Sequence, residues 1–172
     1  TPFSSLPKGW MLCLDSAKAA ATGPFALGRA DFAVVSFYKL FGAPTGLGAV
    51  LTSSRGSRAM LSAKRERGYF GGGSIDRMSP KVVDWTVVKN QVEAAVSDGT
   101  PHYRGISSLP FGFEELDRVG GLRAIERHAG VLADELASRL RQLPLCLVYE
   151  RRVGSSVVVF NVLRPDGTVL SP

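Results

Sequence analysis

The chain has 172 residues, 45% of them hydrophobic and 21% charged, which is typical of a globular domain rather than of a disordered or fibrous chain. Its formal net charge of +6 weakly indicates an anionic ligand. The basic residues do not alternate with aromatic ones along one stretch, so no nucleic-acid partner is expected. No apolar run reaches about 18 residues, and residues 1–8 lack the features of a signal peptide. We therefore expect no membrane partner and a cytoplasmic location.

The first predicted strand is the continuous apolar run at residues 10–14, which ends at Asp15. Such a run is typical of a strand that is buried on both faces of a parallel sheet. A second run, at residues 32–37, predicts another strand, and Lys39 follows it closely. The order predicts an acid and a lysine at the carboxyl ends of two strands.

A third strand is predicted at residues 48–52, and the short loop before it favours antiparallel pairing with the second strand. Residues 55–63 indicate a basic turn or a short helix. The segment 69–73 contains three glycines, which restrict the backbone very little. We expect this segment to lie against a ligand or a neighbouring part of the protein.

Two helices and a hairpin are predicted in the second half of the chain. Apolar residues recur at loosely helical spacing over 103–116, and more regularly over 121–143, where Pro144 ends the pattern. The apolar stripe of the longer helix is expected to be core, and its members are Leu122, Ile125, Ala129, Leu132, Leu136, Leu140 and Leu143. The runs 146–149 and 156–162 then predict two paired strands.

Asp15 and Lys39 together suggest a cofactor. An electron-sink cofactor of the pyridoxal type needs a lysine for its aldehyde, a carboxylate beside its pyridine nitrogen and donors for its phosphate. Ligands of open α/β sheets bind at the carboxyl ends of strands, where both residues are predicted. Ser36, Tyr38 and Thr45 add hydroxyl donors near the lysine. Pattern alone favours a simpler interpretation, in which Asp15 caps a turn and Lys39 is solvated.

The sequence SFYKLFGAPTGLG at residues 36–48, with LDSAK at 14–18, resembles the amino-terminal domain of molybdenum cofactor sulfurases. Those enzymes are similar to cysteine desulfurases within the class V aminotransferase family. Tyr38 is typical of the sulfurase branch, because desulfurases usually have His at this place. The sequence YFGGG at 69–73 also matches, so the resemblance covers most of residues 10–116.

This resemblance implies an α/β fold, that of the pyridoxal-phosphate-dependent transferases of the aspartate aminotransferase type. Residues 1–119 would then be part of the large pyridoxal-phosphate-binding domain. Residues 120–172 would be the long helix and strands of the smaller carboxyl-terminal subdomain, which is incomplete. The chain begins with Thr1 rather than Met and ends just after a strand-like run, so we expect a fragment of a longer protein.

The resemblance also implies a cofactor and the residues that hold it. The cofactor is pyridoxal 5'-phosphate, and Lys39 is the implied catalytic residue that binds it as a Schiff base. Asp15 is implied to hydrogen-bond the pyridinium nitrogen, and Ser36 and Tyr38 to contact the phosphate. Thr100, at the end of the sequence DGT, is implied to reach the phosphate that the partner subunit of a homodimer binds.

The implied activity is that of a molybdenum cofactor sulfurase, a sulfurtransferase of the cysteine desulfurase type that acts in molybdenum cofactor biosynthesis. Sulfur is removed from L-cysteine and passed through an enzyme persulfide to the molybdenum cofactor, which a domain absent from this chain would bind. Two alternatives stay open. One is a general cysteine or selenocysteine desulfurase or another class V aminotransferase, and the other is an inactive fragment that retains the fold.

Cys13 and Cys146 lie far apart and lack the spacing of metal ligands, so no metal site is expected. Each belongs to an apolar run and is expected to be a buried packing residue. The persulfide cysteine is therefore expected outside the chain, and the fragment alone is expected to be inactive. Lys18 stands near the place of a cofactor-contacting Gln in desulfurases; its role and that of His102 are left open.

Overall fold

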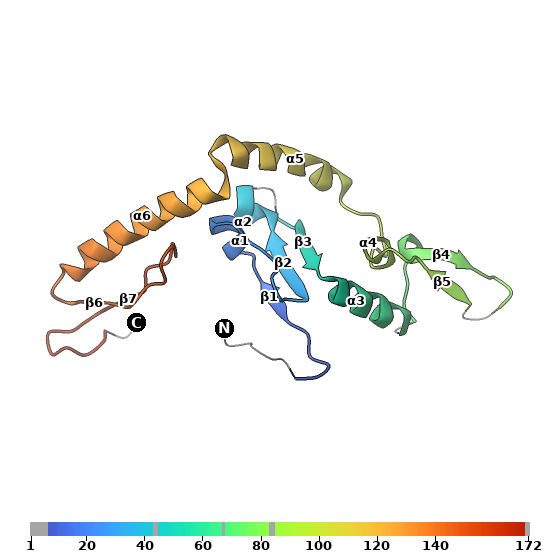
Figure 1. The fold of residues 1–172 in the computed structure, drawn as a ribbon, viewed down its shortest axis with the longest axis horizontal. Coiled ribbons are helices and arrows are strands. Elements are labelled where there is room, and N and C mark those ends of the chain that lie inside the picture. Colours follow the sequence, from blue (N-terminus) through green and yellow to red (C-terminus); the bar gives the residue numbers. More distant parts are fainter. Residues whose placement is uncertain (1–6, 43–44, 67, 83–84, 171–172) are drawn as a thin grey trace.

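The computed structural model describes residues 7–42, 45–66, 68–82 and 85–170 (Figure 1). They form a mixed α/β structure, in which a three-stranded sheet lies between two separate two-stranded sheets. Among the described residues, no helix is long and apolar enough to span a membrane.

The three-stranded sheet has the predicted topology. Its strands, in spatial order, are β1 (Cys13–Asp15), β2 (Phe32–Ser36) and β3 (Gly48–Thr52). β1 runs parallel to β2, with Asp15 opposite Val34, and β3 is antiparallel to β2, with Gly48 opposite Ser36. The short connection between β2 and β3 allows only an antiparallel return, as the sequence predicts.

Burial of the first strand differs from the expectation. Cys13 and Asp15 are exposed and Leu14 is half-buried, so the prediction of a strand covered on both faces is wrong for this chain. A continuous apolar run marks a strand between two packed layers. Here β1 packs chiefly on β2, and the described residues supply too little of a second layer to cover its faces.

A helix follows each strand of this sheet. The helices are α1 (Ala19–Thr22), α2 (Phe37–Phe41) and α3 (Ser54–Glu66). The predicted basic segment at 55–63 is therefore helical, and the helix is longer than expected. Lys39 lies on α2 rather than at the end of a strand. α2 stops at Gly42, whose φ of 75° suits glycine and whose N–H donates to the carbonyl of Tyr38.

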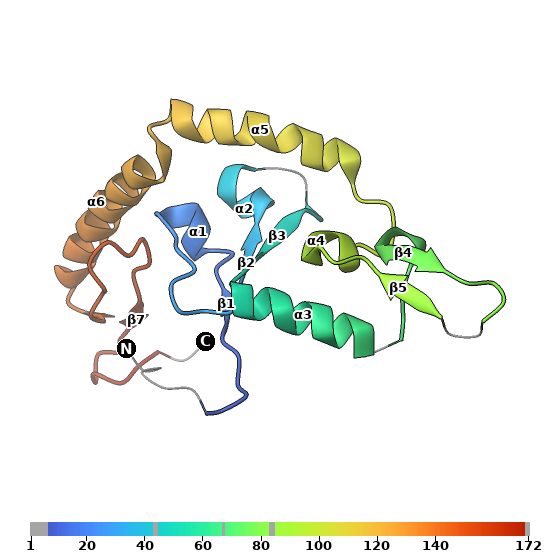
Figure 2. The ribbon, with the colours of Figure 1, turned by 45° about the vertical axis from the view of Figure 1, so that its right-hand side comes forward.

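A hairpin and two short helical segments follow α3, and none of them was predicted. They are η1 (Gly72–Ser74), β4 (Ile75–Met78), β5 (Thr86–Val88) and α4 (Val92–Ala95). β4 and β5 pair antiparallel and project from the rest of the chain (Figure 2). The sequence of β4, Ile-Asp-Arg-Met, has only one β-branched residue and no aromatic residue, so it gives a weak strand signal.

Helix α5 (Tyr103–Arg118) confirms the prediction at 103–116 and holds α2 in place. The rings of Phe37 and Phe41 have centroids 5.7 Å apart, and Phe113 of α5 packs edge-on against both, at 6.2 and 5.2 Å. Phe41 can lie this close to α5 because a Cβ on Gly112 would stand 2.2 Å from its ring. Aromatic packing of this kind fixes the orientation of α2.

Helix α6 (Gly121–Arg141) is present as predicted, but its leucine stripe is not core. Leu132 and Leu136 are 57% and 47% exposed, whereas Ala133 and Ala137 are 5% and 2% exposed. α6 packs on α1, α5 and the strand that follows it, and small residues allow these elements to approach closely. The predicted hairpin also forms, from β6 (Cys146–Val148) and β7 (Phe160–Val162).

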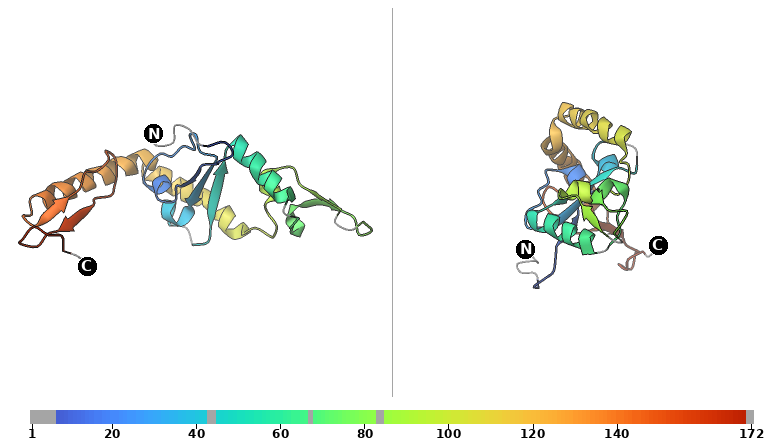
Figure 3. Two further views of the ribbon diagram at one scale, coloured as in Figure 1. Left: turned by 90° about the horizontal axis from the view of Figure 1, so that it is seen from below. Right: turned by 90° about the vertical axis from the view of Figure 1, so that its right-hand side faces the viewer.

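The two hairpins lie at opposite ends of an elongated molecule (Figure 3). β4 and β5 form one end, β6 and β7 the other, and the three-stranded sheet occupies the middle. The division of the chain at residue 120 into a large domain and a smaller subdomain stays a prediction.

Candidate functional site

The carboxyl ends of β1 and β2 form one edge of the three-stranded sheet. Asp15 is the last residue of β1 and pairs with Val34, and the parallel β2 ends two residues later at Ser36. The structure therefore brings Asp15 and Ser36 to the same edge. In open α/β sheets, ligands bind at this kind of edge.

The carboxylate of Asp15 has one local partner and remains exposed. Its Oδ1 accepts a hydrogen bond of 3.1 Å from the backbone N–H of Ala17, so Asp15 does cap a turn. The same residue also lines an open hollow of about 480 Å³, together with Lys18, Glu126 and Arg152. Capping therefore leaves the carboxylate accessible to a ligand, and the two interpretations of Asp15 are compatible.

Lys39 stands on the outer side of α2. Its side chain is exposed, and Nζ lies 5.6 Å from the ring centroid of Tyr38, within the range of a cation–π contact. No ion pair between Lys39 and an acid occurs among the described residues. Because Phe37 and Phe41 anchor the helix on its other side, the lysine is held by a fixed backbone and keeps its amine free.

Ser36 and Tyr38 flank the start of α2. Ser36 is half-buried and occupies the N-cap position, but its side chain makes no capping hydrogen bond. Tyr38 is 43% exposed. Both hydroxyls are therefore available near the lysine, and their contact with a phosphate stays a prediction.

Thr100 is not brought to this edge. It is exposed in the segment between α4 and α5, and within the described part of the chain it makes no recorded contact with Asp15, Ser36 or Lys39. The segment that follows lies against the loop after Lys39, because Thr45 and His102 line a common hollow of about 200 Å³.

His102 has a structural role that the sequence did not reveal. It is exposed, and its Nδ1 accepts a hydrogen bond of 2.8 Å from the backbone N–H of Gly105, which caps the start of α5. Lys18 is exposed too, and its Nζ lies 3.4 Å from the hydroxyl of Ser156.

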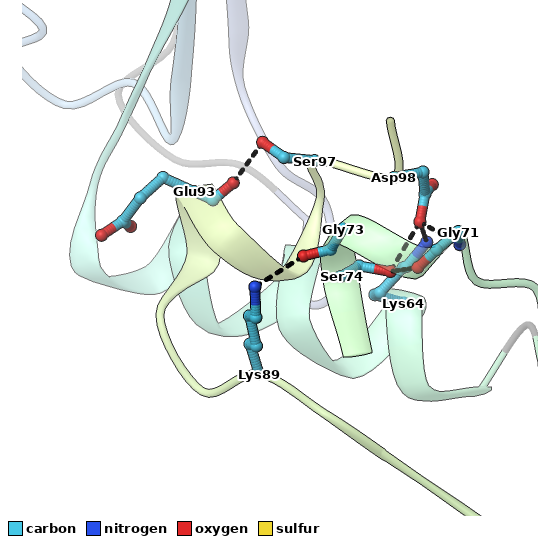
Figure 4. Close-up of polar contacts among 8 residues, drawn as sticks. All are labelled: Lys64, Gly71, Gly73, Ser74, Lys89, Glu93, Ser97 and Asp98. Carbon is cyan, nitrogen blue, oxygen red and sulfur yellow. Dashed lines mark hydrogen bonds and ion pairs between the residues drawn. The ribbon is translucent and has the colours of Figure 1, made fainter. Parts of the chain in front are cut away.

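Asp98 is the residue that sequence reasoning missed. Its Oδ1 accepts three hydrogen bonds, from Lys64 Nζ at 2.5 Å, from the N–H of Gly71 at 2.7 Å and from the hydroxyl of Ser74 at 2.7 Å (Figure 4). These donors, with Lys64 first, lower the pKa of the carboxyl to about 2. No motif spacing links the four residues, so only the folded chain shows the cluster.

The glycine-rich segment lies against a neighbouring part of the protein, as predicted. A Cβ on Gly71 would stand 2.1 Å from the carbonyl oxygen of Asp98, and one on Gly73 would stand 2.4 Å from that of Ser97. Gly73 also donates its N–H to the carbonyl of Asp98, at 3.2 Å. Glycine is needed at these two places because the two backbones touch.

Asp31 is a second acid whose role the sequence did not reveal, and this role is structural. Asp31 is 4% exposed, and its Oδ2 accepts a hydrogen bond of 2.9 Å from the N–H of Leu12 and contacts Arg55 Nη1 at 3.4 Å. It joins the segment before β1, the start of β2 and α3. Buried carboxylates are stable only with such partners.

The expectation of two buried cysteines is wrong. Cys13 is exposed and Cys146 is half-buried. The exposure of Cys13 has the same cause as that of the rest of β1, because the described residues supply no covering layer for this strand. Among the described residues, no group of three or more His, Cys, Asp or Glu side chains is arranged to hold a metal ion.

Comparison with known proteins shows which family this chain belongs to. Residues 5–168 match the model described as Aminotransferase class-V. A molybdenum cofactor sulfurase of Drosophila persimilis is 36% identical, over 96% of this chain and 24% of that protein. One of Bos taurus is 35% identical, over 97% of this chain and 20% of that protein. The chain thus spans between 20% and 24% of the length of these relatives.

Solved structures share the fold. The cysteine desulfurase CsdA from Escherichia coli has a TM-score of 0.70 at 23% identity, over 90% of this chain and 36% of that one. A cystine C-S lyase in complex with its product cysteine persulfide has a TM-score of 0.58 at 19% identity, over 86% of this chain and 38% of that one. These likenesses confirm the predicted fold class.

Proposed function

The chain belongs to the class V aminotransferase family, and on that premise we propose that it forms part of the active site of a pyridoxal-phosphate-dependent molybdenum cofactor sulfurase. Such an enzyme takes sulfur from L-cysteine and transfers it to the molybdenum cofactor. Similarity to proteins named molybdenum cofactor sulfurase over nearly the whole chain supports this choice over a general cysteine desulfurase.

One observation carries the proposal. The parallel register of β1 and β2 places Asp15 and Ser36 at one edge of the sheet, and α2 begins directly after Ser36 with Lys39 as its third residue. An exposed carboxylate, a free hydroxyl and an exposed amine are the groups that pyridoxal phosphate requires. The donor set of this edge therefore fits the cofactor.

Each residue has a defined task in this proposal. Lys39 Nζ would hold the aldehyde of the cofactor, and the same amine would move protons at the substrate. Asp15 would hold a proton on the pyridine nitrogen, and Ser36 and Tyr38 would donate hydrogen bonds to the phosphate. Bound pyridoxal phosphate supplies the sink for the electrons released from the substrate.

The proposed sulfur transfer conserves atoms and electrons and needs no external oxidant. The carbon–sulfur bond of L-cysteine breaks, its sulfur joins the thiol of an acceptor cysteine, and alanine and a persulfide are the products. We place the acceptor cysteine outside these 172 residues, because neither Cys13 nor Cys146 lines the hollow beside Asp15. The molybdenum cofactor site is placed outside them too. Thr100 would act on the phosphate of a second subunit, because it does not reach the edge formed by Asp15 and Ser36 in its own chain.

The first test is spectroscopic. The full-length protein with pyridoxal phosphate is expected to be yellow and to lose its visible band on treatment with borohydride. Lys39→Ala should abolish the band, whereas Lys81→Ala, which removes an exposed lysine between β4 and β5, should leave it unchanged. A colourless wild-type protein, or a band that survives in Lys39→Ala, contradicts the proposal.

A second assay separates the sulfurase from a general desulfurase. The full-length protein with L-cysteine should reactivate a molybdenum hydroxylase that lacks its terminal sulfur. Sulfide release from cysteine without this reactivation would favour the general desulfurase instead.

A further inference from the structure

The segment that carries Thr100 is fixed on both sides by side chains that the proposed chemistry does not use. Two residues before it, Asp98 accepts the three hydrogen bonds described above. Two residues after it, His102 caps α5 through the N–H of Gly105. Thr100 itself is exposed. An exposed threonine between two anchored positions has a defined backbone and a free hydroxyl.

The anchor at Asp98 is the stronger of the two. Residues 97–98 meet residues 71–74 at a junction, and both sides of it are tied to the rest of the chain (Figure 4). The hydroxyl of Ser97 donates to the carbonyl of Glu93 at 2.6 Å, and Lys89 Nζ donates to the carbonyl of Gly73 at 2.8 Å. Removing the charge from one acceptor that serves three donors weakens all three hydrogen bonds, and the one with Lys64 most. The backbone contacts of Gly71 and Gly73 alone would not hold residues 97–100 in place.

The ion pair between Asp98 and Lys64 reduces the repulsion that a phosphate near Thr100 would meet. A bare carboxylate two residues away would repel a phosphate, with an energy that grows as the separation falls. The carboxylate of Asp98 is paired with Lys64, whose side chain is only 10% exposed and whose Nζ lies 5.2 Å from the ring centroid of Tyr69. The positive charge of Lys64 offsets the negative charge of Asp98, so the ion pair presents little net charge to a phosphate.

We propose that Asp98 is a positioning residue for Thr100, which it presents to a phosphate group by fixing residues 97–100 against residues 71–74, at the end of the glycine-rich segment. This inference rests on the proposed function, in which Thr100 binds the phosphate of pyridoxal phosphate. It adds a residue to the site that touches neither cofactor nor substrate and acts only through the backbone that it orders.

The decisive experiment measures the affinity of the full-length protein for pyridoxal phosphate and for pyridoxal, which lacks the phosphate, by titration of absorbance. Asp98→Asn should weaken pyridoxal phosphate binding about tenfold, the effect of one charged hydrogen bond, and leave pyridoxal binding unchanged. Glu93→Gln is the matched control: it removes a negative charge from α4, and its carboxylate points away from Asp98 (Figure 4).

A double-substitution cycle separates positioning from general destabilisation. If Asp98 acts through Thr100, Asp98→Asn should weaken binding no further once Thr100→Ala is present. Equal losses in both backgrounds, equal losses for pyridoxal and pyridoxal phosphate, or an unchanged affinity in Asp98→Asn would each overturn the inference.

A cofactor-free measurement tests the structural half of the inference. Amide hydrogen exchange at Gly71 and Gly73 should accelerate in Asp98→Asn and stay unchanged in Glu93→Gln. Unchanged exchange at Gly71 in Asp98→Asn would overturn the inference even if the affinity falls. Wild-type protein that fails to bind pyridoxal phosphate overturns the proposed function and this inference together, whereas intact binding that ignores Asp98 overturns this inference alone.

Discussion

The edge formed by Asp15 and Ser36, with Lys39 on the helix that follows, differs from the junction around Asp98 in how far its side chains are satisfied within the protein. At the edge, side chains are exposed or half-buried and have few partners of their own. At the junction, one carboxylate oxygen takes three donors and two glycines bring backbones into contact. Groups that bind a ligand must be left free, whereas groups that support them must be satisfied within the protein. Substitutions in the two regions should therefore fail in different ways.

The largest loss of stability is expected at the junction from Gly71→Ala. The new Cβ would stand 2.1 Å from the carbonyl oxygen of Asp98, so one of the two backbones must move. We expect the free energy of unfolding to fall by about 3 kcal/mol, the upper part of the usual range for overpacking. Gly72→Ala is the control, because nothing lies within 4 Å of its Cβ. Urea denaturation measures both, and equal losses would remove the steric argument.

Asp31→Ala should lower the free energy of unfolding somewhat less than Gly71→Ala does. It leaves the N–H of Leu12 without its acceptor and Arg55 without its carboxylate, which lowers the free energy of unfolding by about 2 kcal/mol. Asp76→Ala removes an exposed acid of β4 and should change the unfolding energy by less than about 0.5 kcal/mol. If both variants unfold at the same urea concentration, Asp31 does not hold β1, β2 and α3 together.

A smaller effect on the free energy of unfolding is expected when the pH is lowered. The pKa of Asp98 is lowered in the folded state to about 2, so its contribution to stability is complete above its ordinary value of 3.8. That contribution is lost as the pH falls towards 2. In Asp98→Asn, the unfolding energy should depend less steeply on pH across this window. Parallel pH profiles of wild type and Asp98→Asn would show that the carboxylate is not held by Lys64, Gly71 and Ser74.

The smallest change in stability is expected at the edge, from Asp15→Asn. Asparagine can still accept the hydrogen bond from Ala17, so the unfolding energy should change by less than about 0.5 kcal/mol. The variant should nevertheless bind pyridoxal phosphate more weakly, because a neutral amide does not hold the proton on the pyridine nitrogen. Weak binding with intact stability distinguishes the edge from the junction; a large loss of stability would erase that distinction.

Local patterns account for what could be predicted. The apolar runs and the short loop predicted the three strands of the central sheet, and the regular spacing and Pro144 predicted α6 closely, because these signals act between neighbours in sequence. The edge residues were predicted from a family motif together with the strand ends. Their chemical roles stay predictions until a ligand is bound.

Long-range contacts account for what was missed. The donors to Asp98 lie 24 to 34 residues away, and no spacing rule joins a turn to a glycine-rich segment at that distance. On α6, an apolar stripe was expected to be core, but the buried residues of the helix are Gly130, Ala133 and Ala137. Which face of an amphipathic helix is covered depends on the partner elements, and the helix sequence does not specify them.

The most direct test is to find which side chain carries the cofactor. Full-length protein is incubated with pyridoxal phosphate, reduced with borohydride, digested and analysed by mass spectrometry. The account predicts a phosphopyridoxyl group on the peptide that contains Lys39 and on no other peptide. A label on another lysine, or no label at all, would contradict it.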